Sequence, residues 1–183
     1  MEKEKIILGI DPGTSVSGYG IVEIIDKKPQ IIAIGIIDLR KIKDHYVKIK
    51  NVYDRTLGLI DEYHPDELAI ESPFYSNNVQ SMLKLGRAQG AAISAALNRS
   101  LPIFEYSPRK IKMSITGSGS ASKEQVAGML INMFNLKNLP KELDATDGLA
   151  AAICHFYQNT KINKTKSSSS WNDFLKNNPD RIL

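Results

Sequence analysis

The sequence predicts an α/β fold in which helices cover both faces of one mixed sheet. Three apolar segments rich in β-branched residues follow one another within the first 38 residues. After them, segments with helical spacing alternate with two more short apolar runs, and further helices complete the pattern. Adjacent strands followed by helix–strand alternation are typical of a mixed sheet with a helical layer on each side.

Turn residues divide the N-terminal region into a three-stranded meander. A turn built on Pro12 and Gly13 follows the first apolar segment, and the polar stretch DKKP separates the second segment from the third. The predicted strands are residues 5–11, 19–25 and 30–38.

The rest of the chain alternates helices with short strands. Residues 43–63 carry apolar side chains at helical spacing, and this helix must end at His64 because the residue before Pro65 disfavours helical backbone. Ser107-Pro108 opens another helix, with proline in its first turn. The other predicted elements are strands at 67–71 and 102–106, helices at 77–98, 123–135 and 144–158, and a flexible loop at 117–122.

Composition separates a core domain, residues 1–158, from a polar tail, residues 159–183. The tail is rich in Ser, Lys and Asn, which predicts flexibility. It also holds a short apolar motif in which Trp171, Phe174 and Leu175 would form one stripe of a helix. Two interpretations of this motif stay open: it docks on a partner, or it folds back onto its own domain.

Several classes of protein are excluded by simple counts. The 183 residues are 42% hydrophobic and 24% charged, as in an ordinary globular domain. No apolar run approaches the roughly 20 residues of a membrane span, and the charged N-terminus is no signal peptide. The single Cys154 rules out an intrachain disulfide and fits a reducing compartment, so we expect a cytoplasmic location.

Positive charge is local rather than general. The net charge is +4, and most of it comes from the tail. One internal region nevertheless holds seven basic residues against Glu105 alone, and it is either a solvated face or a surface for nucleic acid. These residues are Lys84, Arg87, Arg99, Arg109, Lys110, Lys112 and Lys123.

Four carboxylates stand where the fold would bring them together. Asp11 ends the apolar run IILGID and Glu71 ends the run ELAIE, and functional groups of open sheets lie at such strand ends. Asp144 and Asp147 are three residues apart and share one face of a helix. Taken singly, Asp11 could be a turn residue and Asp144 a helix cap. Together they would repel one another unless divalent cations compensate them, and two Mg²⁺ ions about 4 Å apart suit phosphodiester cleavage.

The helix at 77–98 carries a face of small residues: Gly86, Gly90, Ala91 and Ser94. Glycine costs about 1 kcal/mol in a helix interior, so two of them suggest the close approach of another helix. We expect that helix to belong to a second copy of the chain, and the subunit's own core is the alternative.

Four segments make this chain resemble the RuvC family of bacterial Holliday-junction resolvases. They are ILGIDPGTSVSGYG, AIESPFYSNNVQSMLKLGRAQGAA, PIFEYSPRKIKMSITGSGSASKEQV and DATDGLAAAICH, within about residues 5–158. The resemblance implies an RNase H-like fold, a homodimer and a Mg²⁺ requirement that Mn²⁺ is expected to satisfy as well. It also implies that the four catalytic carboxylates are Asp11, Glu71, Asp144 and Asp147.

The resemblance extends to residues that would contact DNA. Lys112 and Lys123 match basic residues of the family and would act on phosphate charge. Phe74 matches an aromatic residue used against the junction, and with Tyr75 it would stack on unpaired bases, although both could equally be core residues. The other expected DNA contacts are Lys84, Arg87, Arg109 and Lys110.

The implied activity is structure-selective endonuclease cleavage of four-way (Holliday) DNA junctions in recombination and repair. A twofold dimer would nick two like strands of a twofold substrate, leaving 5′-phosphate and 3′-hydroxyl ends. The branch-migration proteins RuvA and RuvB are the implied partners.

An actin-like ATPase or sugar kinase also uses a DxGT turn, but it needs two such domains, for which 183 residues are too few. A non-catalytic RNase H-like module that binds nucleic acid or protein is the other alternative.

Overall fold

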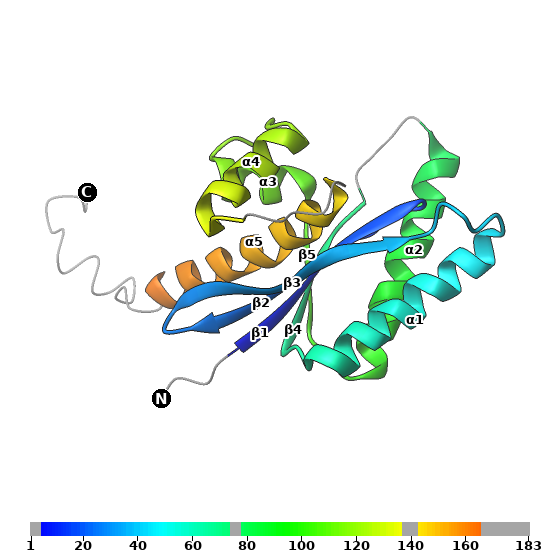
Figure 1. Cartoon of the computed structure of the whole chain (residues 1–183), viewed down its shortest axis with the longest axis horizontal. Coiled ribbons are helices and arrows are strands. Elements are labelled where there is room, and N and C mark those ends of the chain that lie inside the picture. The colour runs from blue at the N-terminus through cyan, green and yellow to red at the C-terminus, as the bar shows by residue number, and fades with distance from the viewer. Residues whose placement is uncertain (1–4, 74–77, 137–142, 166–183) are drawn as a thin grey trace, which may run out of the picture.

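The computed structural model describes residues 5–73, 78–136 and 143–165, and these form a five-stranded sheet with helices on both faces (Figure 1). The predicted mixed α/β architecture is therefore confirmed. The strands are β1 (Lys5–Asp11), β2 (Val16–Ile25), β3 (Lys28–Asp38), β4 (Glu67–Glu71) and β5 (Ile103–Tyr106). The helices are α1 (His45–Tyr63), α2 (Val79–Asn98), α3 (Pro108–Thr116), α4 (Lys123–Phe134) and α5 (Asp144–Thr165).

The sheet has the order β3-β2-β1-β4-β5, with the meander on one side and the later strands on the other. β1, β2 and β3 pair antiparallel, whereas β4 runs parallel to β1, and β5 runs parallel to β4. Asp26 and Lys27 make a two-residue hairpin turn with left-handed φ values of 50° and 64°, the backbone that matches the twist of paired strands. β2 begins at Val16, earlier than predicted, because Val16 already pairs with Asp38 of β3.

Helix ends are fixed by local hydrogen bonds. Asp44, Asn78 and Ser107 each accept a bond from a backbone N–H in the first turn of the helix that follows. His64 ends α1 in the left-handed conformation, with its N–H donating to the Ile60 carbonyl.

The segment at 117–122 is more constrained than a flexible loop. Gly117 ends α3 with a φ of 76°, and Ser122 forms a reciprocal capping box with Gln125 at the start of α4. Between them, the Ser118 N–H donates to Thr116 Oγ1 at 3.1 Å. The sequence indicated flexibility through its Gly and Ser content, but these residues serve as caps and turn donors.

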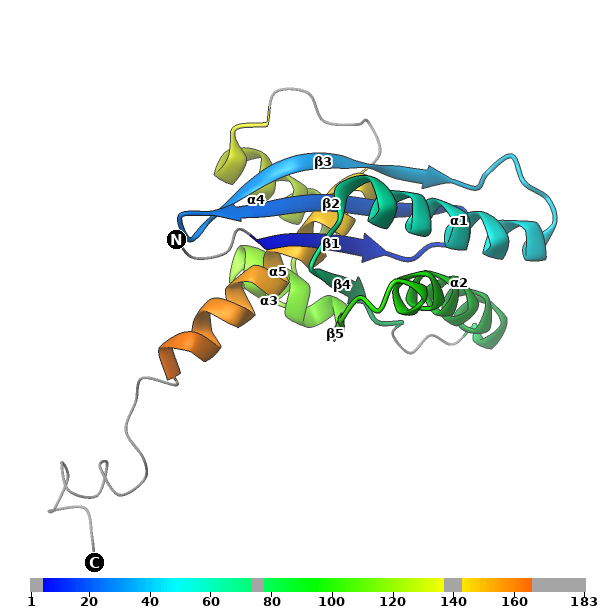
Figure 2. The same cartoon turned by 90° about the horizontal axis from the view of Figure 1, so that it is seen from below.

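Helices cover both faces of the sheet, as the two views show (Figures 1 and 2), and a hydrophobic cluster lies between the sheet and each helical layer. Leu8 and Ile10 of β1 point toward α1 and α2, whereas Ile7 points toward α3, α4 and α5. Such alternation is the period-two pattern of a strand buried on both faces. α5 lies across the sheet and brings its N-terminal turn to the ends of β1 and β4.

Glycines allow α5 to lie directly on the sheet backbone. A Cβ atom at Gly18 of β2 would lie 1.7 Å from the Asp144 carbonyl oxygen, and one at Gly148 of α5 would lie 2.5 Å from the Gly18 carbonyl carbon. Real side-chain atoms cannot approach so closely, so both positions require glycine. This contact fixes the height of the first turn of α5 above β1 and β2.

α5 is longer than the sequence indicated. It continues to Thr165 rather than ending at residue 158, so it crosses the predicted boundary between domain and tail. The apolar motif at 171–175 lies outside the described residues. A search of the described residues finds no helix long and apolar enough to cross a membrane.

Candidate active site

The four carboxylates predicted from the sequence gather at one edge of the sheet. β1 and β4 are neighbouring parallel strands with Ile10 paired to Ile70, so Asp11 and Glu71 leave the sheet at the same end. The first turn of α5 adds Asp144 and Asp147 above them. The clustering therefore follows from parallel register and from the close packing of α5.

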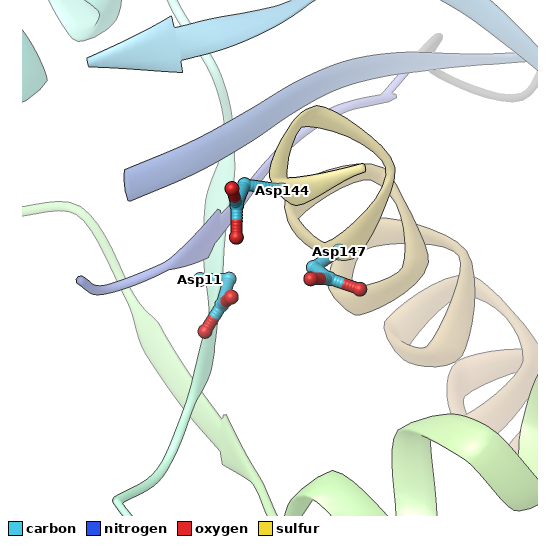
Figure 3. Close-up of side chains that lie close together, drawn as sticks. All are labelled: Asp11, Asp144 and Asp147. Carbon is cyan, nitrogen blue, oxygen red and sulfur yellow. The ribbon is translucent and has the colours of Figure 1, made fainter. Parts of the chain in front are cut away.

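Three of the carboxylates form a tight cluster (Figure 3). One oxygen each from Asp11, Asp144 and Asp147 lies within 4.8 Å of the other two, so a single cation could contact all three. Asp147 is only 9% exposed. Glu71 lines the same cavity as Asp11 and Asp147, which has a volume of about 200 Å³. The donor set is all carboxylate oxygen, the ligand type that Mg²⁺ and Mn²⁺ prefer.

Two lysines bring positive charge to this cavity. Lys123, the first residue of α4, has its Nζ 3.3 Å from an Asp144 oxygen and pairs more closely with Asp147. Lys112 of α3 also lines the cavity, together with the apolar residues Ile111 and Val126. Cationic groups that line the same cavity as the carboxylates can contact a phosphate bound there.

Burial and nearby negative charge make Asp11, Glu71 and Asp147 hard to ionise. Burial, reinforced by the nearby Asp147 and Asp144 carboxylates, raises the pKa of Asp11 to about 7 despite the opposing Lys123 charge. Burial and the carboxylates of Asp11 and Asp147 likewise raise the pKa of Glu71 to about 8. Burial also raises the pKa of Asp147, against its hydrogen bond from Lys123. Carboxyls in this state gain most from a bound divalent cation.

Lys123 is held in its charged form. Partial burial alone would lower its pKa, but the hydrogen bond to Asp147 and the carboxylates of Asp11 and Asp144 raise that pKa above its ordinary value. In the metal-free protein this ammonium group supplies part of the positive charge that the carboxylates need.

The remaining basic residues predicted to bind DNA do not line this cavity. Arg109 packs its side chain against Gly119, and Lys110 places its Nζ 5.2 Å from the centre of the Tyr106 ring. Arg87 is exposed on α2, and Lys84 lines a different cavity. The two aromatic residues predicted to stack on bases, Phe74 and Tyr75, lie outside the described residues.

The positioning glycines escaped the sequence analysis. Gly18 and Gly148 carry no functional side chain, yet they set the distance between α5 and β2 and so the position of Asp144 and Asp147. Their signal in the sequence is the run GYG in a strand together with DGLAAA in a helix, two small-residue segments that can pack backbone to backbone.

The mixed sheet, with carboxylates at two parallel strand ends and a helix over them, defines a nuclease of the RNase H-like class. A family model described as crossover junction endodeoxyribonuclease RuvC matches residues 7–155. The chain belongs to this RuvC family of crossover junction endodeoxyribonucleases.

Curated relatives and solved structures agree with this assignment. The crossover junction endodeoxyribonuclease RuvC of Christiangramia forsetii is 58% identical over 182 residues, covering 100% of this chain and 95% of the relative. The protein of the same name from Bacteroides fragilis is 58% identical and covers 98% of this chain and 97% of its own length. The structure of T. thermophilus RuvC in complex with a Holliday junction substrate matches with a TM-score of 0.77 and 28% identity, covering 86% of this chain and 96% of that one.

Proposed function

We propose that this protein resolves four-way DNA junctions by paired symmetric nicks that leave 5′-phosphate and 3′-hydroxyl ends. The observation that carries the proposal is the convergence of Asp11, Glu71 and Asp147 with two lysines in one cavity. The family assignment selects the junction as the substrate, and the T. thermophilus relative is described with that substrate bound. We further infer that the protein acts in the cytoplasm with the branch-migration proteins RuvA and RuvB.

The carboxylates are proposed to hold two Mg²⁺ ions per subunit, with Mn²⁺ as a substitute. Asp11, Asp144 and Asp147 have the oxygen spacing for one shared cation, and Glu71 would complete the set beside Asp11. The ions would supply water activation and stabilise charge on the leaving oxygen. The protein itself keeps the four carboxylates in place on rigid elements before any DNA arrives.

A nicking assay tests the proposal. A synthetic four-way junction should be cut into nicked duplexes with Mg²⁺, bound but uncut in EDTA, and linear duplex of the same sequence should be left largely intact. ATP hydrolysis measured in parallel tests the actin-like alternative. Junction binding without any cutting in Mg²⁺ or Mn²⁺ would favour a non-catalytic module instead.

Lys112→Ala and Lys123→Ala are expected to reduce turnover by about 10²-fold, because both lysines line the carboxylate cavity and would contact developing phosphate charge. Arg109→Ala and Lys110→Ala, outside that cavity, should mainly weaken binding and reduce its salt dependence. Single-turnover nicking and equilibrium binding separate the two effects. If all four variants lost junction affinity equally and kept the normal single-turnover nicking rate, Lys112 and Lys123 would have no catalytic role.

α2 offers the surface for a homodimer. Val79, Leu83 and Leu97 are 55%, 50% and 62% exposed, and they fall on one stripe with Gly86 and Gly90. A Cβ atom at either glycine would meet nothing within 4 Å among the described residues, so these glycines do not pack against the subunit's own core. An exposed apolar stripe with small residues at its centre fits a second copy of α2, which supports the dimer.

Gly90→Leu is therefore expected to separate the dimer. The leucine side chain has open space around it in a single subunit, but it would overpack the contact between the α2 helices of two subunits. Overpacking of this kind costs about 1–3 kcal/mol. Sedimentation should show a monomer, and junction assays should show single rather than paired nicks. Gly58→Leu on α1, another helix glycine in open space, is the matched control. An intact Gly90→Leu dimer would exclude this stripe as the interface.

A further inference from the structure

A second cavity, of about 240 Å³, lies beside the active site and has no role in the chemistry described above. It is formed by three separate parts of the chain: the turn after β1, the start of α1 with the residue before its cap, and α2. Its lining combines four nitrogen-bearing side chains with two hydroxyl-bearing residues, and it contains no carboxylate. The lining residues are Thr14, Ser15, Lys43, His45, Lys48 and Lys84.

Two groups in this cavity are already arranged for a ligand. Lys48 Nζ donates to the Thr14 carbonyl oxygen at 3.0 Å, which ties α1 to the turn after β1 and leaves the other ammonium protons available. His45 Nε2 is buried, and within the described part of the chain it has no hydrogen-bond partner. A buried polar nitrogen without a partner is uncommon in folded proteins and suggests that a ligand supplies the missing bond.

The chemistry of the lining favours phosphate. Three ammonium groups, an imidazole and two hydroxyls match the several oxygens and negative charge of a phosphate group. A carboxylate ligand would use fewer of these donors, and a cation would be repelled by them. The donors come from α1 with the loop before it, from α2 and from the turn after β1, so the fold brings three separate segments to one cavity.

The cavity also lies close to the carboxylate cluster. Thr14 is three residues from Asp11, so their Cα atoms are at most about 10 Å apart. On the other side, Leu85, the neighbour of Lys84 on α2, lines the narrow space next to Asp11 and Glu71. The cavity is therefore within reach of a DNA strand whose phosphate lies at Asp11, at a distance of a few nucleotides.

We propose that this cavity binds a backbone phosphate of the strand being cut, a few nucleotides from the scissile phosphate. The proposal rests on the proposed junction cleavage and deepens it, because it assigns Lys43, His45 and Lys48 as contacts that set where the strand lies. These residues would position the substrate and take no part in bond breaking. A free phosphate or other small anion is the competing occupant.

The test combines protein variants with a modified junction in EDTA, so that binding is measured without cutting. Lys43→Ala with Lys48→Gln, and separately Lys84→Ala, should weaken junction binding about 10-fold at about 0.1 M salt and reduce the log–log salt slope by about 1 per lost phosphate contact. Lys50→Ala is the matched control, because Lys50 lies on the same helix, pairs with Asp54 and does not line the cavity.

Single uncharged methylphosphonate linkages, placed in turn along the cleaved strand, identify the phosphate. At one position near the cut, the modified linkage should weaken junction binding by the parent protein as much as the substitutions do. The same linkage should cause no further loss in the variants, because the phosphate and the substituted lysines are the two partners of one contact. Additive losses at every position, or variants that bind like Lys50→Ala, would overturn the proposal. If the Lys43/Lys48 double variant does not fold, the same comparison of modified and unmodified junctions is made with Lys84→Ala, and that result decides the proposal.

A final experiment tests whether the cavity binds a small anion instead of DNA. It also separates failure of this proposal from failure of the proposed function. Inorganic phosphate is titrated while the ring signals of His45 are followed by NMR. Signals that respond to phosphate, together with normal junction binding by the variants, would show a small-anion site only and would overturn the DNA assignment. In that case junction nicking by the parent would still support the proposed function.

Discussion

Asp11→Asn is expected to abolish junction cutting while binding to the junction in EDTA is retained. Asp11, like Asp147, belongs to the oxygen cluster and also lines the cavity, so its removal takes a ligand from any cation held there. Losing a metal ligand at such a site is expected to cost at least about 10²-fold in nicking rate. Asp26→Asn is the control, since Asp26 is exposed in the hairpin turn and asparagine tolerates its left-handed backbone.

The same variant should make the metal-free protein more stable at high pH. Below about pH 3 the carboxyls of Asp11 and Glu71 are protonated in both folded and unfolded chains. As pH rises toward the folded-state pKa values of about 7 and 8, the unfolded chain loses these protons first, so the folded state binds more protons and stability falls. Asparagine removes one of these charges and relieves its repulsion of Glu71.

Thermal unfolding in EDTA measures this effect. The melting temperature of Asp11→Asn should exceed that of the parent at pH 8, and the difference should disappear near pH 3. Each kcal/mol corresponds to about 2–4 °C for a chain of this size. A parent protein whose stability rises from pH 5 to pH 8 through these groups, or a variant that cuts at the normal rate, would contradict the site assignment.

Gly18→Ala is expected to disable cutting without touching any carboxylate. Its Cβ atom would lie 1.7 Å from the Asp144 carbonyl oxygen, so α5 must move away from β2 and carry Asp144 and Asp147 with it. A displacement of about 1 Å at a catalytic group can cost about 10²-fold in rate. The strain should also destabilise the fold by about 1–3 kcal/mol.

Gly128→Ala on α4 is the matched control for this prediction, because a Cβ atom there meets nothing within 4 Å. The control should keep full activity and lose no stability, since alanine favours a helix more than glycine does. Gly148→Ala, which strains the same contact from the α5 side, should reproduce the loss of Gly18→Ala. Normal Mg²⁺-dependent nicking by both variants would show that the spacing of α5 is not set by these glycines.

The outline of the fold and the four carboxylates could be predicted because each depends on a local pattern. Apolar runs bounded by turn residues identified the strands, and Asp11 and Glu71 were visible as acidic ends of two such runs. The structure confirms the mixed sheet and the helices on both faces. What brings Asp147 beside Asp11, however, is the approach of α5, which depends on contacts between residues more than one hundred positions apart.

Features that depend on contacts between separate helices and strands were not predicted. The early start of β2 is decided by its partner β3, since Val16 pairs with Asp38. The cavity near Thr14 lies between α1 and α2, and no spacing within either helix indicates that Lys48 and Lys84 line the same cavity. Local propensity indicates where elements lie, whereas pairing and packing decide which side chains meet.

The pairing of Ile10 with Ile70 determines where this chain can tolerate a change in length. Adding or deleting one residue inside β1 or β4 would turn every following side chain to the opposite face, so Asp11 or Glu71 would point into a hydrophobic layer. The hairpin at Asp26 and Lys27 lies outside this constraint, because its length affects only the far end of the meander. Sequences sharing this fold should therefore vary in length at that hairpin and keep the two strands free of insertions.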